Sequence, residues 1–480
     1  MAYLLESGLI ADGSGAPLWH GDLLIADGRI AALGEGLAAG DAERIDCRGK
    51  VIAPGFIDVH THDDALVLRE PDCLPKVSQG VTTVIVGNCG ISLAPLVVDT
   101  PQPPLNLLGS DAFSFASFEA YAAAVDAARP AVNVAALVGH TTLRFAAMRD
   151  LDRPASSAEL DRMLQLLDEA MRHGAHGLSS GLFYEPAGAA PSSEVLALAR
   201  ATARHQGIYT SHLRDEMSAI LEAMAEACDT AFEAGLPLVI SHHKCAGPDN
   251  WGRSKETLAR VEQFSQRQSI ALDAYPYLAG STVLREDLVD GIIDVLVTWS
   301  TPHPEMSGRM LADIAAEWQV GLHEACRRLQ PGGACYFQMA DEDVERILTH
   351  RLTMIGSDGL PHDSHPHPRL WGAFPRVLAR YWRERGSFTL EQAVHKMTGL
   401  SASRFRLGQR GLLKRGWHAD VVVFDPARVE DTATYDRPIS LARGIESVFV
   451  NGERTYCEGD AGVLAHAGRW LRHGTASPAP

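Results

Sequence analysis

The sequence predicts an α/β protein built around a (β/α)8 barrel, with a small β-sandwich-like domain formed by both ends of the chain. Two observations predict this fold class. Eight short, continuously apolar segments alternate with segments of helical character, which is the pattern of buried parallel strands connected by helices. Short segments of β character with tight turns occupy the two ends of the chain instead.

The eight apolar segments have the length of strands, and several of them end in polar residues. They are GFIDVHTH, TTVIVGNCG, NVAALVGH, GAHGLSSGL, GIYTSHLRDE, LPLVISHHK, IALDAYPY and LTMIGSDGL. Helix-like segments separate most of them, for example residues 157–172, 193–205, 217–234 and 255–268. We therefore expect residues 55–407 to form the catalytic barrel domain.

Both ends of the chain contain strand-like segments joined by two-residue turns. Near the N-terminus, YLLESGLIAD is followed by HGDLLIADGRIAAL, which turns at a DG pair. Near the C-terminus, ADVVVFD is followed by IESVFVNGERTY, which turns at an NG pair, a strong hairpin signal. We expect residues 1–54 and 408–480 to form one small β domain.

The stretch 285–340 interrupts the alternation between the seventh and eighth apolar segments. It contains Pro302, Pro304 and a PGG turn. We expect this stretch to be an insertion that forms a lid within the barrel domain.

Composition limits the kinds of partner. The 480-residue chain has 46% hydrophobic and 21% charged residues, as in ordinary soluble globular proteins, and its formal net charge is −17. That charge argues against nucleic acid or an anionic membrane as a partner, but a local basic site can still bind a small anionic substrate. No apolar run approaches the roughly 20 residues that span a bilayer, the first residues do not resemble a signal peptide, and the eight cysteines include no CxxC pair. We expect a reduced, cytoplasmic monomer or small homo-oligomer that acts on a small molecule.

Several predicted strands end in residues that bind metals. Barrel active sites form at the carboxyl ends of the strands, so these side chains are expected to converge. The residues are His60, His62, Cys89, His212, His242 and Asp358. A single strand-end histidine is more often structural, and a single cysteine in an apolar run is nearly always core. Six such residues at the ends of several strands instead predict a site for a borderline-soft ion such as Zn²⁺.

A nucleophilic mechanism is the rival chemical interpretation. The one GxSxG match, GLSSG at residues 177–181, lies within the fourth predicted strand segment and not at a strand-to-helix turn, and no base can be placed beside Cys89 from the sequence. The metal hypothesis explains more residues with one assumption.

With these residues identified, the chain resembles the amidohydrolase superfamily and, within it, the N-acyl-D-amino-acid deacylases (D-aminoacylases). The motifs that carry the resemblance are PGFIDVHTHDD, GNCGIS, GLSSGLFYEP, SHLRDE, ISHHK, DAYPY, TWSTPHPE and IGSDGLPHDSHPHPRLWGAFPRVLARY. The resemblance implies a TIM-type (β/α)8 barrel. It also implies that a strand-two cysteine helps to hold zinc where many relatives use a carboxylated lysine on strand four, and the fourth segment here has no lysine.

The resemblance implies specific roles for the metal-binding residues. Cys89, His212 and His242 would bind one tightly held Zn²⁺, and His60, His62 and Asp358 would form a second, weaker position. His243 is the ambiguous neighbour of His242, because adjacent strand residues point to opposite faces. Asp358 would also be the general base in the hydrolysis of a linear amide.

The resemblance also implies a binding site for an N-acyl-D-amino acid. The residues expected to bind the α-carboxylate are Lys244, Tyr184, Tyr275 and Arg369. The residues expected to form a hydrophobic pocket, suited to D-amino acids such as Leu, Met or Phe, are Phe183, Tyr336 and Met339. The charged loop LREDLVDG departs from a purely apolar wall. We expect His362, His365 and His367 to shape a lid near Arg369, and His140 to lie near the site without binding the metal.

Other activities remain as alternatives. A cyclic-amide hydrolase of the same superfamily, such as a dihydroorotase or hydantoinase, predicts the strand-four lysine that is absent here. A non-catalytic metal-binding protein would be indicated by loss of Asp358, which is present. A phosphoesterase on the same scaffold leaves Lys244 and Arg369 less well explained.

Overall fold

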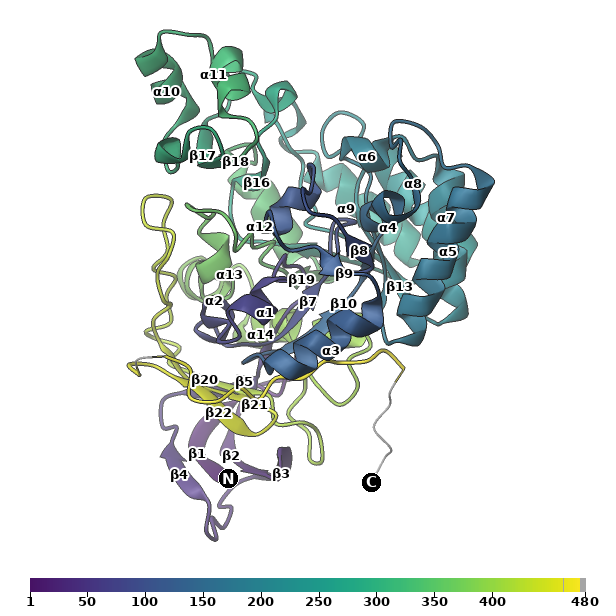
Figure 1. Cartoon of the computed structure of the whole chain (residues 1–480). Coiled ribbons are helices and arrows are strands. Elements are labelled where there is room, and N and C mark those ends of the chain that lie inside the picture. The colour runs from purple at the N-terminus through teal and green to yellow at the C-terminus, as the bar shows by residue number, and fades with distance from the viewer. Residues whose placement is uncertain (461, 475–480) are drawn as a thin grey trace.

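The computed structural model describes residues 1–460 and 462–474, and its centre is a barrel of parallel strands (Figure 1). Its strands, in order around the barrel, are β6 (Phe56–Asp58), β7 (Val81–Val86), β10 and β11 together (Asn133–Ala136 and Val138–Gly139), β12 (Gly177–Gly181), β13 (Ile208–His212), β14 (Leu238–Ile240), β15 (Ile270–Ala274) and β19 (Thr353–Ile355). A parallel bridge between Thr61 and Gly359 joins the ends of the first and last strands. All eight predicted segments therefore contribute to the barrel, and the predicted fold class is confirmed.

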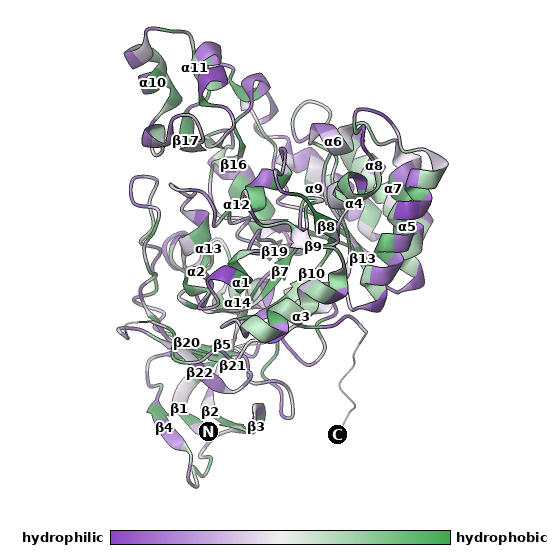
Figure 2. Ribbon diagram, viewed as in Figure 1, coloured by the Kyte–Doolittle hydropathy of each residue, from purple (hydrophilic) through white to green (hydrophobic). Residues whose placement is uncertain are grey.

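Amphipathic helices cover the barrel. The predicted helices are found as α5 (Ser157–Arg172), α7 (Ser192–Arg204), α8 (Ile220–Ala234) and α9 (Ser254–Ser265). Helix α5 begins at a capping box in which Ser156 and Glu159 satisfy each other's backbone N–H groups. Its buried residues, including Met163, Leu167 and Ala170, recur at helical spacing, whereas the barrel strands are buried throughout. Figure 2 shows both hydrophobic and hydrophilic residues on α5 and α7. Within the described residues, no helix combines the length and apolarity needed to cross a membrane.

Strands from both ends of the chain form one eight-stranded sheet below the barrel (Figure 1). Its members are β1 (Tyr3–Ile10), β2 (Trp19–Ala26), β3 (Arg29–Gly34), β4 (Glu43–Asp46), β5 (Val51–Pro54), β20 (Val421–Phe424), β21 (Ile445–Val450) and β22 (Glu453–Cys457). The antiparallel pairing of β5 with β20 connects the N-terminal strands to the C-terminal ones. The exact limits of this domain stay a prediction, and residues 461 and 475–480 of the predicted range lie outside the described residues.

A second antiparallel sheet stands at the opposite end of the molecule from the small β domain (Figure 1). It contains β16 (Gly280–Val283), β18 (Gly332–Tyr336) and β17 (Val295–Ser300), in that spatial order. Helices α10 (Leu311–Trp318) and α11 (Leu322–Leu329) pack on it through a separate hydrophobic core that includes Val297, Ile314 and Leu329. Most of this unit falls within the predicted insertion 285–340, and β16 precedes it. Its action as a lid stays a prediction.

Candidate active site

Three of the strand-end residues have an unusual backbone conformation. Cys89, His242 and Asp358 have φ angles of 54°, 34° and 50°, in the left-handed region that residues other than glycine seldom adopt. Each such conformation costs on the order of 1–3 kcal/mol and persists only where the surrounding structure enforces it. In the VGNCGIS turn, Gly87 and Gly90 also have positive φ, at 79° and 76°. This sharp turn places the Cys89 thiol beside His60 and His242.

The structure brings Cys89, His212 and His242 together as one group. His242 Nε2 lies 2.9 Å from His212 Nδ1 and 3.3 Å from Cys89 Sγ. All three residues are buried, and their ligand atoms lie within 4.8 Å of one another. These are the three residues predicted to hold the tightly bound ion.

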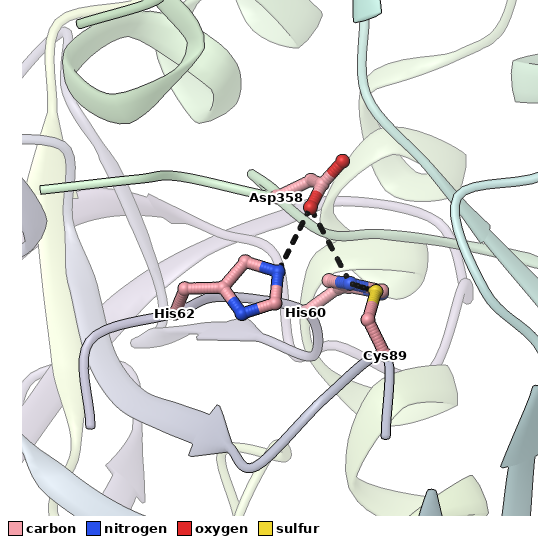
Figure 3. A group of neighbouring side chains, drawn as sticks. All are labelled: His60, His62, Cys89 and Asp358. Carbon is pink, nitrogen blue, oxygen red and sulfur yellow. Dashed lines mark hydrogen bonds and ion pairs between the residues drawn. The ribbon is translucent and has the colours of Figure 1, made fainter. Parts of the chain in front are cut away.

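The remaining predicted ligands form a second group that shares the same thiol (Figure 3). Asp358 Oδ1 lies 3.5 Å from His60 Nε2 and 3.4 Å from His62 Nε2. Cys89 Sγ lies 3.2 Å from His60 Nε2. Cys89 therefore stands between the two groups, a position from which one sulfur can contact both.

These side chains fit zinc. Ligand atoms around a tetrahedral Zn²⁺ are roughly 3.3–3.8 Å apart, because each is about 2.0–2.3 Å from the ion. The contacts among Cys89, His212 and His242 are near that range, and they direct nitrogen lone pairs and a sulfur at one point. Burial raises the pKa of Cys89, but the charges of His60 and His242 outweigh it and bring the pKa well below its ordinary value. The thiol is therefore a thiolate, which is the form that binds zinc.

Two buried carboxylates contact His60 and His242 at the ring nitrogens that do not face Cys89. Neither carboxylate was among the predicted site residues. Asp273 on β15 places Oδ1 3.1 Å from His60 Nδ1 and accepts a hydrogen bond of 2.8 Å from the His242 backbone N–H. Glu216, just after β13, places Oε1 3.1 Å from His242 Nδ1. An aspartate within the apolar segment IALDA is a signal that could have identified Asp273, since a buried carboxylate requires a partner. Glu216 lies four residues after His212 in SHLRDE.

Arg369 and Tyr275 form a group of donors beside Asp358. Arg369, the first residue of α13 (Arg369–Arg376), is fully buried, and its NH1 lies 2.9 Å from Asp358 Oδ2. Its guanidinium lies 4.5 Å from the centre of the Tyr275 ring. Within the described residues, Arg369 Nε and the Tyr275 hydroxyl have no hydrogen-bond partner. Buried donors without partners are costly, so this arrangement is suited to an anionic ligand that would pair with them.

A cavity joins the metal-binding groups to aromatic and cationic side chains. The sequence-predicted residues that line it are His62, Cys89, Phe183, Tyr184, His212, His242, Lys244, Tyr275, Tyr336 and Asp358. The Phe183 ring stacks on His212 with centroids 5.1 Å apart, and the Tyr184 hydroxyl lies 3.1 Å from Thr282 Oγ1. Met339 is buried outside this lining. Ten further lining residues were not among the predicted site residues, and they include Leu107, Met217, Leu288 and Gln338.

Four other predicted histidines have structural partners away from both metal-binding groups. His243 Nε2 lies 2.8 Å from Thr257 Oγ1, and His140 Nε2 lies 2.9 Å from Glu194 Oε1. His365 Nε2 contacts the Tyr435 carbonyl at 2.6 Å, and His367 Nε2 contacts the Ala279 carbonyl at 3.0 Å.

His362 and the charged loop lie near the site without joining either metal-binding group. His362 is close to Gly109 and Arg69, and burial lowers its pKa to about 4. In LREDLVDG, the Arg285 guanidinium lies 4.5 Å from the centre of the Phe183 ring and 2.6 Å from Asp287. Arg285 therefore packs against the Phe183 ring, and its charge is paired with the Asp287 carboxylate.

Known proteins resemble the chain in both sequence and structure. The sequence matches the amidohydrolase family over residues 43–290 and 303–456. A D-aminoacylase of Alcaligenes xylosoxydans xylosoxydans is 50% identical over 469 residues, which cover 98% of this chain and 97% of that protein.

Two solved structures are similar over nearly the full length. One is a D-aminoacylase, described in terms of a binuclear metal center with one-metal activation and second-metal attenuation. It has a TM-score of 0.95 and 50% identity, and the match covers 98% of this chain and 99% of that one. The other is an N-acyl-D-glutamate deacylase from Bordetella bronchiseptica complexed with zinc and a phosphonate inhibitor. It has a TM-score of 0.92 and 47% identity, and the match covers 98% of this chain and 99% of that one.

Proposed function

Because the chain belongs to the amidohydrolase family, we propose that it is a zinc-dependent hydrolase that cleaves the linear amide of N-acyl-D-amino acids. One observation supports this most strongly. Asp358 faces the metal-binding histidines through Oδ1 and the Arg369 guanidinium through Oδ2, and Arg369 Nε has no hydrogen-bond partner among the described residues. A substrate with an acyl carbonyl and an α-carboxylate has the two groups that such a site would bind.

Cys89, His212 and His242 would hold one tightly bound Zn²⁺. His60, His62 and Asp358 would form the second, weaker position, with the Cys89 thiolate shared between the two. The one-metal activation described for the similar D-aminoacylase supports this assignment of the first position. When bound, zinc supplies Lewis acidity that polarises a carbonyl and makes water a better nucleophile.

Asp358 would move the proton during hydrolysis. Burial raises its pKa, but the charges of Arg369 and His242 outweigh burial and hold the pKa well below its usual value. The side chain is therefore ionised and accepts a proton from the attacking water. As the C–N bond breaks, Asp358 returns this proton to the leaving nitrogen, which gives a carboxylate and a free D-amino acid.

The substrate α-carboxylate would bind to Arg369, Tyr275, Lys244 and Tyr184. Arg369 can offer two parallel N–H groups, whereas Lys244 offers a point charge.

The substrate side chain would enter a mainly apolar pocket formed by Phe183 and Tyr336, with Met339 buried three residues further along. Leu107, Met217 and Leu288 add apolar surface, which supports a preference for D-Leu, D-Met or D-Phe. Tyr336 and Leu288 belong to the insertion 285–340, which supports its proposed action as a lid over this pocket.

A cyclic-amide hydrolase remains a weaker alternative. Strand β12, Gly177–Gly181, has no lysine to carboxylate, and Cys89 supplies the negative charge that such a group would bring. The extensive similarity to linear-amide deacylases also favours the proposed reaction.

Paired substrates test the proposed reaction. Zinc-loaded protein is assayed with N-acetyl-D- and N-acetyl-L-forms of Leu, Met, Phe and Glu, and with dihydroorotate. We expect turnover of the D forms, with the apolar side chains preferred over D-Glu. Equal turnover of both enantiomers, or turnover of dihydroorotate alone, would contradict the proposal.

A further inference from the structure

Glu216 is a buried carboxylate in contact with three side chains of the proposed site. It lies in the segment between β13 and α8, and it is 7% exposed. Its Oε1 lies 2.6 Å from Lys244 Nζ and 3.1 Å from His242 Nδ1, and its Oε2 lies 3.6 Å from His212 Nε2. One carboxylate therefore faces both histidines of the tight zinc position and the lysine assigned to the substrate carboxylate.

The two histidines present opposite ring nitrogens to this carboxylate. His242 directs Nε2 toward Cys89 and Nδ1 toward Glu216, whereas His212 directs Nδ1 toward His242 and Nε2 toward Glu216. A neutral imidazole binds a metal through one nitrogen and carries its proton on the other. Zinc binding therefore needs the Nδ1–H tautomer of His242 and the Nε2–H tautomer of His212. Glu216 Oε1 lies within hydrogen-bond distance of His242 Nδ1, at 3.1 Å, whereas its Oε2, at 3.6 Å from His212 Nε2, is too far for a hydrogen bond.

Lys244 competes with Glu216 for contact with His242 Nδ1. Its Nζ lies 2.8 Å from His242 Nδ1 as well as 2.6 Å from Glu216 Oε1. If the ammonium donates to Nδ1, the imidazole proton must sit on Nε2, which is the nitrogen needed for zinc. When Glu216 accepts from the ammonium instead, Nδ1 is free to carry its own proton and donate it to the same carboxylate.

We propose that Glu216 is a positioning residue that selects the zinc-binding tautomer of His242 and draws Lys244 away from His242 Nδ1. The proposal rests on the zinc site proposed above and couples it to the substrate carboxylate site through one side chain. Carboxylates behind metal-binding histidines commonly change metal affinity 10–100-fold, which gives the scale of the expected effect.

Zinc affinity, measured by competition with a chromophoric chelator, tests the proposal without reference to turnover. We expect Glu216→Ala to bind zinc about 10–100-fold more weakly than the unsubstituted protein. Glu216→Gln keeps an acceptor oxygen but not the charge. Its zinc affinity should therefore lie between those of Glu216→Ala and the unsubstituted protein. Glu194→Ala is the matched control, since Glu194 is also a buried carboxylate beside a histidine, His140, but lies outside both metal-binding groups. It should leave zinc affinity unchanged.

A double substitution separates tautomer selection from simple support of the fold. If Lys244 captures His242 Nδ1 once Glu216 is gone, Glu216→Ala combined with Lys244→Met should bind zinc more tightly than Glu216→Ala alone. Lys244→Met alone should keep zinc affinity but raise KM for N-acetyl-D-leucine. Wild-type zinc affinity in both Glu216 variants, or no recovery in the double variant, would overturn the proposal. Because zinc binding is measured directly, failure of the proposed hydrolysis would be seen separately, as normal zinc affinity without turnover.

Discussion

Asp358 occupies the position where the proposed metal binding and the proposed proton transfer meet. Its two oxygens face different partners, His60 and His62 on one side and Arg369 on the other. Its left-handed backbone, with φ of 50°, is strain that the contact of its N–H with the His60 carbonyl at 2.7 Å helps to hold in place. Asparagine has a similar shape but only one acceptor oxygen, so it would keep at most one of these two sets of contacts and could not accept the proton.

Replacing Asp358 by asparagine should therefore affect the rate far more than the tight metal site. We expect kcat for N-acetyl-D-leucine to fall about 10²–10⁴-fold, the usual contribution of a general base. Zinc content at the Cys89, His212 and His242 position should stay near that of the unsubstituted protein. Steady-state kinetics and metal analysis on the same preparation measure both quantities, and near-normal turnover would rule out the proton-transfer role.

Arg369 is proposed to recognise the substrate α-carboxylate with two parallel hydrogen bonds. Lysine keeps the charge but not this geometry, so Arg369→Lys should lower kcat/KM for N-acetyl-D-leucine about tenfold or more. An N-acetyl amine that lacks the carboxylate is the control substrate. Its slow turnover should differ little between the two proteins, and an equal loss for both substrates would show that Arg369 acts through Asp358 instead.

At the scale of secondary structure elements, close backbone contact with the end of strand β12 fixes the turn after β7 that carries Cys89. A Cβ atom added to Gly181 would lie 2.1 Å from the Cys89 carbonyl oxygen, and one added to Gly90 would lie 2.7 Å from the Gly181 backbone nitrogen. Backbone atoms cannot move aside as a flexible side chain can. The turn can therefore keep its place only if both residues remain glycine.

Gly181→Ala should displace the Cys89 turn. We expect weaker zinc binding together with a lower Tm, because the added methyl group forces β12 away from the turn. Gly408→Ala is the control, since a Cβ at Gly408 has no neighbour within 4 Å. Chelator competition and thermal unfolding test this prediction, and unchanged zinc affinity in Gly181→Ala would show that the turn does not depend on this contact.

The sequence predicted the strands and their end residues well because both depend on local pattern. Continuous apolar segments mark buried parallel strands, and polar residues at their carboxyl ends are obvious against that background. Glu216 and Asp273 were missed because their role depends on which atoms meet in space. The opposite facing of His242 and His243 was predicted from strand alternation, but β14 ends at Ile240, before both His242 and Lys244, and His242 has a φ of 34°. A turn, not a strand, brings both side chains to the cavity.

At the scale of the whole molecule, buried charged groups connect two of the helices that cover the barrel. Glu194 on α7 lies 2.6 Å from Arg144 NH1 and 2.9 Å from His140 Nε2, both on α4 (His140–Ala147). Burial raises the pKa of Glu194, but the hydrogen bonds from His140 and Arg144 outweigh burial and lower the pKa to about 2. The folded state therefore favours the ionised carboxylate more than the unfolded chain does.

This contribution to stability should be present above about pH 4.5 and be lost as the pH falls toward 2. A shift of this size corresponds to about 3 kcal/mol, since one pKa unit is about 1.4 kcal/mol. We expect Glu194→Gln to lower the urea midpoint at pH 7, with the difference from the unsubstituted protein shrinking below pH 4.5. Urea unfolding of both proteins between pH 7 and about pH 2 measures this difference in midpoint. A difference that does not vary with pH would contradict the assignment of the stabilisation to ionised Glu194.

A buried site lies between the barrel strands and the insertion 285–340. The chemistry proposed for it depends on zinc at the Cys89, His212 and His242 position. The most direct test is a zinc titration of metal-free protein, following turnover of N-acetyl-D-leucine and its L enantiomer at each step. We predict that D turnover rises in proportion to zinc until about one ion per chain is bound, while L turnover stays at background. Full turnover without zinc, or equal turnover of the two enantiomers at every step, would contradict the proposed function.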